Sequence, residues 1–177
     1  TLILYMFNAK ENLNILKNAK LSLILERLTE FLMLHIKQQY EAGADVVQIF
    51  DSWAGLLPTS NINNYCFIPN LKLVEFCKKN NLPVICFPKG LNKEYKKFLE
   101  IVKPDGLSID YNIDPNWAKE NLKDVCIQGG MDPKILLEKE EKVFSEVEKY
   151  LNIFNNSPYI FNLGHGVVPD TKPEVIK

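Results

Sequence analysis

The sequence lacks several features that would identify a class of protein at once. No apolar run approaches the roughly 20 residues that a membrane-spanning helix needs. Neither charge sign is in excess, because 21 basic and 22 acidic residues leave a formal net charge of -1. We therefore expect neither a membrane nor nucleic acid among the partners of this chain.

Metal-binding and disulfide patterns are also missing. None of the four cysteines belongs to a CxxC pair, and the chain has only two histidines. This spacing fits neither a zinc ribbon nor a dense disulfide framework. We predict free, buried thiols in a cytoplasmic protein, and no metal site. The cysteines are Cys66, Cys77, Cys86 and Cys126.

The first residues lack an initiator methionine and the basic segment of a signal peptide. Residues 1–7 are apolar, which is typical of the inside of an ordered element. We therefore expect a fragment or a truncated form of a longer protein. The 177 residues, 46% of them hydrophobic, suit one globular domain, and no interior stretch has the composition of a domain boundary.

The sequence does contain an alternation of helical and strand patterns. Apolar residues recur at steps of three or four from Leu21 to Ile36, which predicts an amphipathic helix, and Gly43 suits the turn after it. The other predicted helices cover residues 72–79, 93–102, 115–122 and 133–154, and one more begins after Pro173. The predicted strands cover residues 44–50, 83–87, 106–109, 125–128 and 159–163. Such an alternation predicts an α/β fold with a parallel sheet.

Polar and glycine-containing motifs follow each predicted strand, where α/β folds bind their ligands. They are residues 51–55 (DSWAG), 88–90 (PKG), 110–112 (DYN), 129–132 (GGMD) and 164–166 (GHG). Each polar residue in them has a structural interpretation beside the functional one. Ser52 suits a turn as well as a binding site, and no GxSxG elbow surrounds it. His165 suits a loop or a binding site, whereas His35 lies within a helix and is predicted to be structural or solvent-facing.

The charged residues of these motifs stay open in the same way. Asp51 and Asp110 are candidates for acids, for anchors of an arginine, or for caps. Lys89 is a candidate for neutralising a carboxylate, or a solvated side chain. Asp114 and Asp132 each precede a proline, and this pair of residues predicts the start of a helix.

Taken in series, the motifs resemble those of the uroporphyrinogen decarboxylase family. Residues 43–58 (GADVVQIFDSWAGLLP) are similar to the family's GAxxxQxFDSWAG segment, and residues 87–90 (FPKG) to its FxKG. Residues 128–133 (QGGMDP) resemble QGNLDP, and residues 162–170 (NLGHGVVPD) resemble NLGHGxxPD. The opening TLILYM resembles the end of APxTLxxYM. The departures are Pro88 for Gly, Tyr111 for Trp, Gly130 for Asn and Met131 for Leu.

This resemblance implies a TIM barrel, of which residues 1–177 form the C-terminal part of a single domain. About strands 4–8 and their helices are expected here, with strands 1–3 missing. The implied enzyme is a carboxy-lyase of haem biosynthesis. It converts uroporphyrinogen III to coproporphyrinogen III by removing four acetate carboxyl groups, without a metal or organic cofactor. It acts in the cytoplasm, usually as a homodimer.

The resemblance also assigns site residues. Those implied to bind the substrate are Tyr5, Ser52 and His165. Those implied to shape the pocket are Phe50, Asp51 and Gly166. The family's catalytic aspartate and its arginine-rich segment lie upstream of the matched motifs, so no catalytic residue is expected in this span. We therefore expect the fragment to be inactive alone.

Two alternatives remain open at this point. A corrinoid-dependent methyltransferase of the same superfamily would bind zinc through a His-x-Cys pair, but residues 84–86 read VIC, without the histidine. The other alternative is a non-catalytic fragment that binds porphyrinogen or a partner chain.

Overall fold

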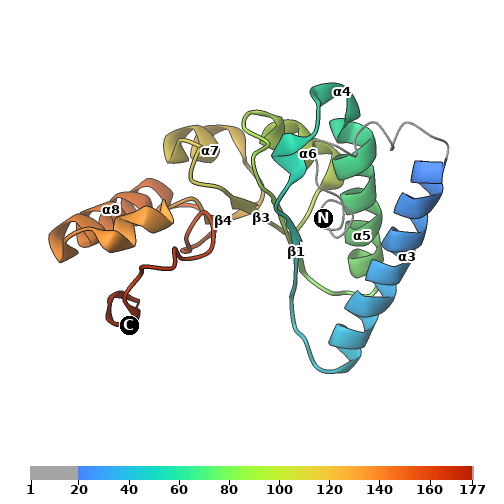
Figure 1. Cartoon of the computed structure of the whole chain (residues 1–177), viewed down its shortest axis with the longest axis horizontal. Coiled ribbons are helices and arrows are strands. Elements are labelled where there is room, and N and C mark those ends of the chain that lie inside the picture. Colours follow the sequence, from blue (N-terminus) through green and yellow to red (C-terminus); the bar gives the residue numbers. More distant parts are fainter. Residues whose placement is uncertain (1–19, 177) are drawn as a thin grey trace. The chain divides into compact units, whose positions relative to one another are not determined.

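The computed structural model describes residues 20–176 and has five strands that alternate with helices (Figure 1). Contacts divide the chain into two compact units, residues 1–105 and 106–177. Each strand pair within the two units is parallel, as predicted. Within residues 20–176 no helix combines the length and the apolar character needed to cross a bilayer.

The first unit places helices around a pair of parallel strands. Strand β1 (Val47–Asp51) pairs with β2 (Val84–Pro88) in a register that sets Asp51 opposite Pro88. The long helices of this unit are α3 (Lys20–Glu41), α5 (Ile68–Lys79) and α6 (Glu94–Val102). Short helical segments follow β1: η2 (Ala54–Leu56), α4 (Thr59–Ile62) and η3 (Asn63–Phe67).

Helix α3 confirms the predicted amphipathic pattern. It lies beside α5 (Figure 1), and its predicted apolar positions are buried or half-buried from Leu21 to Ile36. Gly43 follows the helix with a φ of 102°, the left-handed conformation expected there. His35 is exposed and hydrogen-bonds Gln39 one turn away, so the predicted solvent-facing position is confirmed.

The helix preceding β2 is longer than predicted. It was expected to begin at residue 72, but helical structure runs from Thr59 through a π-helical turn into α5. Pro69 argues against a helix that continues through this region, because a proline cannot donate a hydrogen bond to the preceding turn and usually marks a helix start. Here the π-helical turn lies directly before it, and the helical path continues.

The core of the first unit is aromatic and contains buried thiols. Phe67 and Phe98 are fully buried, and their rings meet edge to face with 5.5 Å between centroids. Cys66, Cys77 and Cys86 are free and buried, as predicted. Cys126 of the second unit is also free but half-buried.

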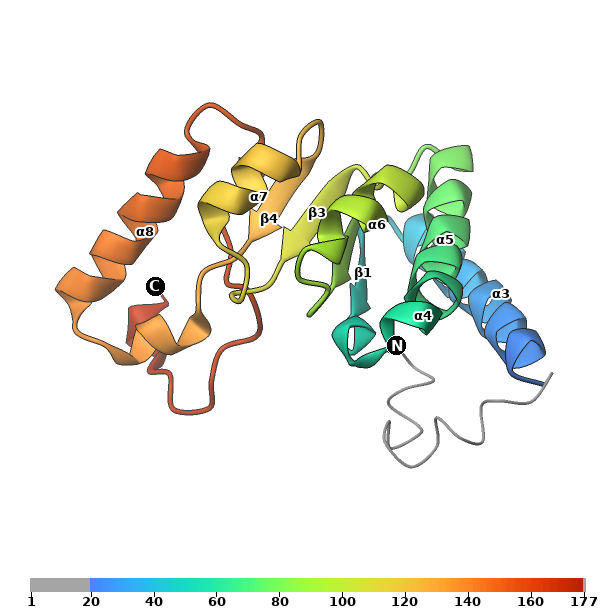
Figure 2. The ribbon, with the colours of Figure 1, turned by 90° about the horizontal axis from the view of Figure 1, so that it is seen from above.

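The second unit has three strands, and each neighbouring pair is parallel. Strand β4 (Cys126–Gly129) pairs with both β3 (Gly106–Ile109) and β5 (Tyr159–Ile160). Helices α7 (Pro115–Asn121) and α8 (Glu140–Phe154) contact each other (Figure 2). Two short 3-10 helices complete the unit: η4 (Pro133–Leu137) and η5 (Pro173–Val175).

Both predicted caps in this unit are confirmed. Asp114 accepts a hydrogen bond from the backbone nitrogen of Trp117 at 2.9 Å, and Asp132 accepts one from that of Lys134 at 2.9 Å. The prediction of one helix over residues 133–154 is wrong. Asp132 starts only the 3-10 turn of η4, and extended backbone at Glu138 and Lys139 separates it from α8.

The last strand is shorter than the predicted range of residues 159–163. Beyond Ile160, only an isolated bridge between Met131 and Leu163 continues the parallel pairing. The cause lies at the end of β4, where its last residue, Gly129, and the following Gly130 have φ angles of 82° and 104°. These angles interrupt the extended backbone, so β5 has no straight partner to follow beyond Ile160.

Because its thiols are buried, the fold should lose stability at alkaline pH. Burial, assisted by the charge of Asp105, raises the pKa of Cys77 from 9.0 to about 11. The neutral thiol therefore contributes its full stabilisation below pH 9, and this contribution is lost as the pH rises through 11. We expect the free energy of unfolding, measured by urea titration, to fall over this range. Cys77→Ala should show a shallower fall, and equal slopes in both proteins would contradict this assignment.

Candidate functional site

Three of the predicted site residues lie together at the carboxyl end of β1. Asp51 is the last residue of the strand and is 5% exposed, whereas the ring of Phe50 is 54% exposed. Ser52 begins the turn that follows and is half-buried. The alternation places Phe50 and Asp51 on opposite faces of the strand. The turn therefore presents a hydroxyl and an aromatic ring, while the carboxylate is turned inward.

The loop after β1 is fastened to the loop after β2 through the main chain. The backbone nitrogen of Lys89 donates to Asp51 O at 3.1 Å, and that of Gly55 donates to Lys89 O at 2.9 Å. Gly55 lies so close to Gly90 that a Cβ added to Gly55 would overlap the backbone of Gly90. The DSWAG and PKG motifs, which are separate in the sequence, therefore form one structure.

The Asp51 carboxylate belongs to a buried polar cluster that the sequence did not reveal. Asn70, on α5, donates to Asp51 Oδ2 at 3.4 Å and to Cys66 O at 2.9 Å. Asp51 Oδ1 has no hydrogen-bond partner among the described residues. Burial, followed by the nearby negative charge of Asp51, raises the pKa of the Cys66 thiol far above its usual value. The thiol is therefore protonated at neutral pH and is not a nucleophile.

The second unit positions His165 by a close approach of backbone. Gly164 donates from its nitrogen to Met131 O at 2.7 Å, which holds the loop beside the end of β4. A Cβ added to Gly164 would overlap the backbone of Tyr111 and lie 2.9 Å from the carbonyl carbon of Asp110. Only glycine fits there, and its neighbour His165 is consequently held, with its side chain exposed, near the carboxyl end of β3.

Asp110 has a structural role in this arrangement. It is fully buried, and its Oδ1 accepts a hydrogen bond from the backbone nitrogen of Asn112 at 2.9 Å. Of the three roles left open for Asp110, this geometry favours that of a cap. The carboxylate stabilises the turn after β3 and is not presented to solvent.

Two tyrosines stabilise the glycine turn after β4. The hydroxyl of Tyr159 donates to Gly129 O at 2.8 Å, and that of Tyr150 donates to Gly130 O at 2.7 Å. Burial raises the pKa of both phenols, that of Tyr150 to about 12. They remain neutral donors at physiological pH. At Gly130, where the family usually has asparagine, an added Cβ would lie 3.0 Å from the Tyr150 ring.

The structure therefore groups most of the predicted site residues by unit. Phe50, Asp51 and Ser52 belong to the first, His165 and the exposed Gly166 to the second, and Tyr5 lies outside the described residues. Sequence reasoning missed three contributors to these loops: Asn70, Tyr150 and Tyr159. The only sign of Asn70 in the sequence was its polar side chain among the mostly apolar residues that precede Cys77. Among residues 20–176, no group of three or more His, Cys, Asp or Glu side chains is placed to hold a metal ion.

Comparison with known proteins agrees with the motifs. A family model described as uroporphyrinogen decarboxylase (URO-D) matches residues 1–177. A uroporphyrinogen decarboxylase of Orientia tsutsugamushi is 39% identical over 160 residues, which are 87% of this chain and 47% of that protein. One from Cereibacter sphaeroides is 35% identical over 155 residues, covering 85% of this chain and 45% of that protein. The chain thus spans about half the length of these curated relatives.

The two glycines that flank His165 provide a matched pair of substitutions. Gly164→Ala should destabilise the protein by roughly 1–3 kcal/mol, because its Cβ overlaps backbone that has little freedom to move. Gly166→Ala should change stability by no more than about 0.5 kcal/mol, because no atom lies within 4 Å of its Cβ. Urea denaturation of the three proteins measures the difference, and equal effects would refute the close approach at Gly164.

The cluster around Asp51 gives a second stability prediction. Asn70→Ala should cost roughly 1–3 kcal/mol, because it removes a hydrogen-bond donor to the buried carboxylate of Asp51. Asn80→Ala is the control, since Asn80 likewise donates to a backbone oxygen four residues earlier, that of Phe76 at 2.8 Å, but is only half-buried. Chemical denaturation should rank Asn70→Ala as clearly more damaging, and the reverse order would contradict the proposed cluster.

Proposed function

Because the chain belongs to the uroporphyrinogen decarboxylase family, we propose that it supplies about half of a decarboxylase barrel. The complete protein converts uroporphyrinogen III to coproporphyrinogen III in haem biosynthesis. The observation that carries the proposal is the position of the family motifs. The FDSWAG and NLGHG motifs both follow parallel strands, at the ends where barrel enzymes bind their substrates.

The architecture supports a partial barrel. Five strands alternate with helices, and a complete TIM barrel has eight such units in about 250 residues. We assign the five strands to positions 4–8 of the barrel, because the resemblance begins after the third. On this assignment residues 1–177 belong to one barrel domain. The first three strands come from the part of the relatives that lies before the region matched by this chain.

The side chains of these loops suit an anionic substrate with an apolar macrocycle. Ser52 and His165 can donate hydrogen bonds to acetate or propionate carboxylates, and we assign Tyr5 the same role. A protonated His165 would also add positive charge. The exposed ring of Phe50 offers an apolar surface to the macrocycle. Asp51 supports the Ser52 turn from beneath, and Gly166 leaves open space beside His165.

The chemistry itself needs little from this part of the protein. Protonation makes one pyrrole ring of the substrate cationic, and the bond from its acetate methylene to the carboxyl carbon then breaks. Its electron pair enters the ring and carbon dioxide leaves. A proton then adds to the methylene carbon to give a methyl group, and the proton first added to the ring leaves, which restores the pyrrole. The ring is its own electron sink, so no cofactor is required. The protein holds the carboxylates and stabilises the cation electrostatically.

The carboxylate that stabilises the cation must come from outside this span. Asp51 and Asp110 follow strands at the same ends as the two motifs, but both are buried and serve their own loops. We therefore propose that the chain alone is inactive and that activity requires the remaining half of the family's length. The complete protein is proposed to be a cytoplasmic homodimer.

Decarboxylation of uroporphyrinogen III tests this proposal. A joined protein, with the N-terminal half of the Orientia tsutsugamushi relative placed before this chain, should release carbon dioxide, whereas the chain alone should not. Ser52→Ala and His165→Ala should each lower kcat/KM of the joined protein about 10- to 100-fold, the effect of losing a hydrogen bond to a charged group. Ser145→Ala, at an exposed position of α8, should leave it unchanged.

Two results would overturn the proposal. A folded joined protein that binds porphyrinogen without releasing carbon dioxide would identify a non-catalytic binding protein. Activity of the chain alone would show that it contains the catalytic carboxylate after all.

A further inference from the structure

Lys89 lies beside Ser52 at the carboxyl end of the strands of the first unit. The register of β1 and β2 ends with Asp51 opposite Pro88, and the hydrogen bond from Lys89 N to Asp51 O, at 3.1 Å, carries the pairing further. The next residues of the two chains are Ser52 and Lys89, and backbones paired in this way lie about 4.8 Å apart. The ammonium of Lys89, at the end of a long flexible stem, can therefore reach a group that the Ser52 hydroxyl contacts.

The alternation of side chains indicates that Lys89 stands on the face that Ser52 shares with two aromatic rings. Phe50 and Phe87 are opposite each other in the register, and their rings meet edge to face with 6.1 Å between centroids. Ser52 follows Phe50 by two residues and Lys89 follows Phe87 by two, the spacing that returns a side chain to the same face. The residue between each pair is buried, as this alternation requires. This end of the unit thus combines a hydroxyl, an ammonium and the exposed ring of Phe50.

The half-buried side chain of Lys89 has neither an ion pair nor a hydrogen bond from its ammonium among residues 20–176. The carboxylate of Asp51 accepts from Asn70 instead, although the backbone of Asp51 is bonded to that of Lys89. Lys119, which is also half-buried, shows what a structural role requires, because its ammonium donates to Ile153 O. A charge that is partly removed from water costs free energy unless it is paired, so Lys89 calls for a partner.

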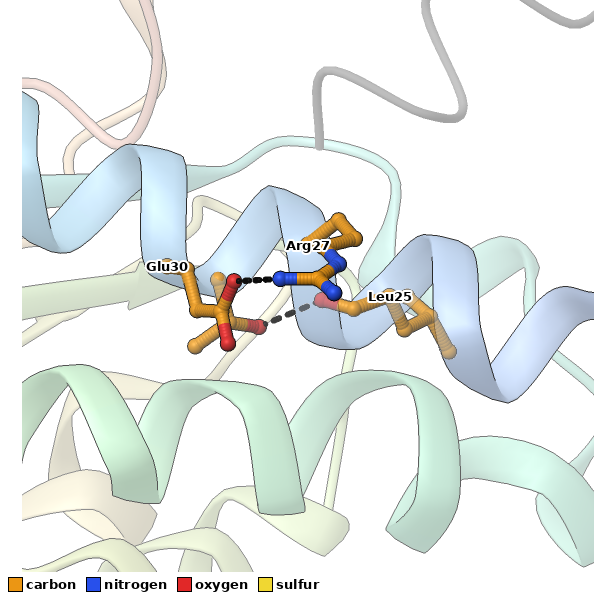
Figure 3. A network of polar contacts seen from close by, with 4 residues as sticks. Leu25, Arg27 and Glu30 are labelled. Atoms are coloured by element: carbon orange, nitrogen blue, oxygen red, sulfur yellow. Dashed lines mark hydrogen bonds and ion pairs between the residues drawn. The ribbon is translucent and has the colours of Figure 1, made fainter.

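The other ion pairs of the described chain are local to helices. Arg27 pairs with Glu30 at 2.9 Å on α3, as Figure 3 shows beside the hydrogen bond from Thr29 to Leu25 O. The remaining pairs likewise join residues three or four apart along the chain: Lys37 with Glu41, Lys142 with Glu138 and Lys149 with Glu146. Lys89 follows a strand and has no such neighbour, so a carboxylate partner would come from outside the described residues.

We propose that Lys89 is a further substrate-binding residue, which pairs with the same carboxylate that accepts the hydrogen bond of Ser52. This inference rests on the proposed function and names the group of the anionic substrate that the first unit holds. The hydroxyl orients the carboxylate, and the ammonium neutralises its charge. The other interpretation left open for Lys89, a solvated side chain, predicts no contribution to binding.

Binding of uroporphyrin III, the stable oxidised form of the substrate with the same carboxylates, tests this role without catalysis. Fluorescence titration gives the Kd for the chain alone, or for the joined protein if the chain alone binds too weakly to measure. Lys89→Met keeps an aliphatic side chain and removes the charge, so it should raise the Kd about 10- to 100-fold, the loss expected for a charged pair. Lys89→Arg should stay within about threefold of the unsubstituted protein, because it keeps the charge.

The matched control is Lys79→Met, which removes the same charge from the exposed end of α5, before β2 instead of after it. It should change the Kd by less than about twofold, because salt screens a distant surface charge. Lys89→Met should also make binding less dependent on ionic strength, which a purely structural role would not do. Its thermal midpoint should move by no more than about 2 °C, since the ammonium has no partner in the described chain to lose.

A double substitution tests whether Ser52 and Lys89 hold one carboxylate. If they do, Ser52→Ala with Lys89→Met should weaken binding by less than the product of the two single effects, because each group depends on the other. Independent effects would overturn the shared carboxylate. Coproporphyrin III, which keeps the propionates and lacks the acetates, then identifies the group. An equal loss for both porphyrins assigns Lys89 to a propionate, and a loss confined to uroporphyrin assigns it to an acetate.

The inference and the proposed function fail in different ways. If the unsubstituted protein binds uroporphyrin and Lys89→Met binds it as tightly as Lys79→Met does, Lys89 is a solvated side chain and the inference is overturned. A joined protein that binds no porphyrin would instead refute the proposed function. A joined protein that binds uroporphyrin through Lys89 without releasing carbon dioxide from uroporphyrinogen would refute the decarboxylase and leave the role of Lys89 standing.

Discussion

Contact between backbones at the ends of the strands is the constraint on which both candidate loops depend. In the first unit Gly55 lies against Gly90, and in the second Gly164 lies against the backbone of Tyr111. No side chain fits in either contact. Ser52 is in the loop closed by the first, and His165 is adjacent to the second. The two candidate side chains are thus positioned by main-chain packing.

The interior beneath these loops stays uncharged, apart from its capping carboxylates. The thiols of Cys66 and Cys86 and the phenols of Tyr150 and Tyr159 all have a pKa raised by burial, so they are neutral at physiological pH. The buried neutral groups and the polar residues of the loops therefore have separate roles. The buried tyrosines stabilise turns, and contact with the anionic substrate is the role proposed for Ser52 and His165.

The sequence predicted those parts of the fold that local patterns determine. The five strands and the long helices were identified because their apolar residues repeat with the period of a strand or a helix. The two aspartate caps were identified because Asp-Pro has a local geometric meaning. The outcomes that depended on distant residues were missed. Examples are the path of helix through Pro69, which relies on a π-helical turn, and the early end of β5, which follows from the glycine turn after β4.

The candidate site shows the same limit. Family motifs singled out Ser52 and His165, but neither motif contains Asn70 or Tyr150, because these side chains reach the loops from helices 19 or 20 residues away along the chain. Periodicity gave no sign of them either.

The π-helical turn over Asn63–Phe67 has a consequence for how this region tolerates change in length. A π turn accommodates one more residue between hydrogen-bonded groups than an α turn does. Each residue of an α-helix rotates the chain by about 100°, given 3.6 residues per turn. Removing one residue from Asn63–Phe67 would restore a regular α-helix and leave the segments on its two sides facing nearly as before, because four α-helical residues turn the chain about as far as five π-helical ones. Asn70, which lies after this turn, would therefore keep its place beside Asp51 after such a deletion, whereas Cys66, which lies within the turn, would be displaced.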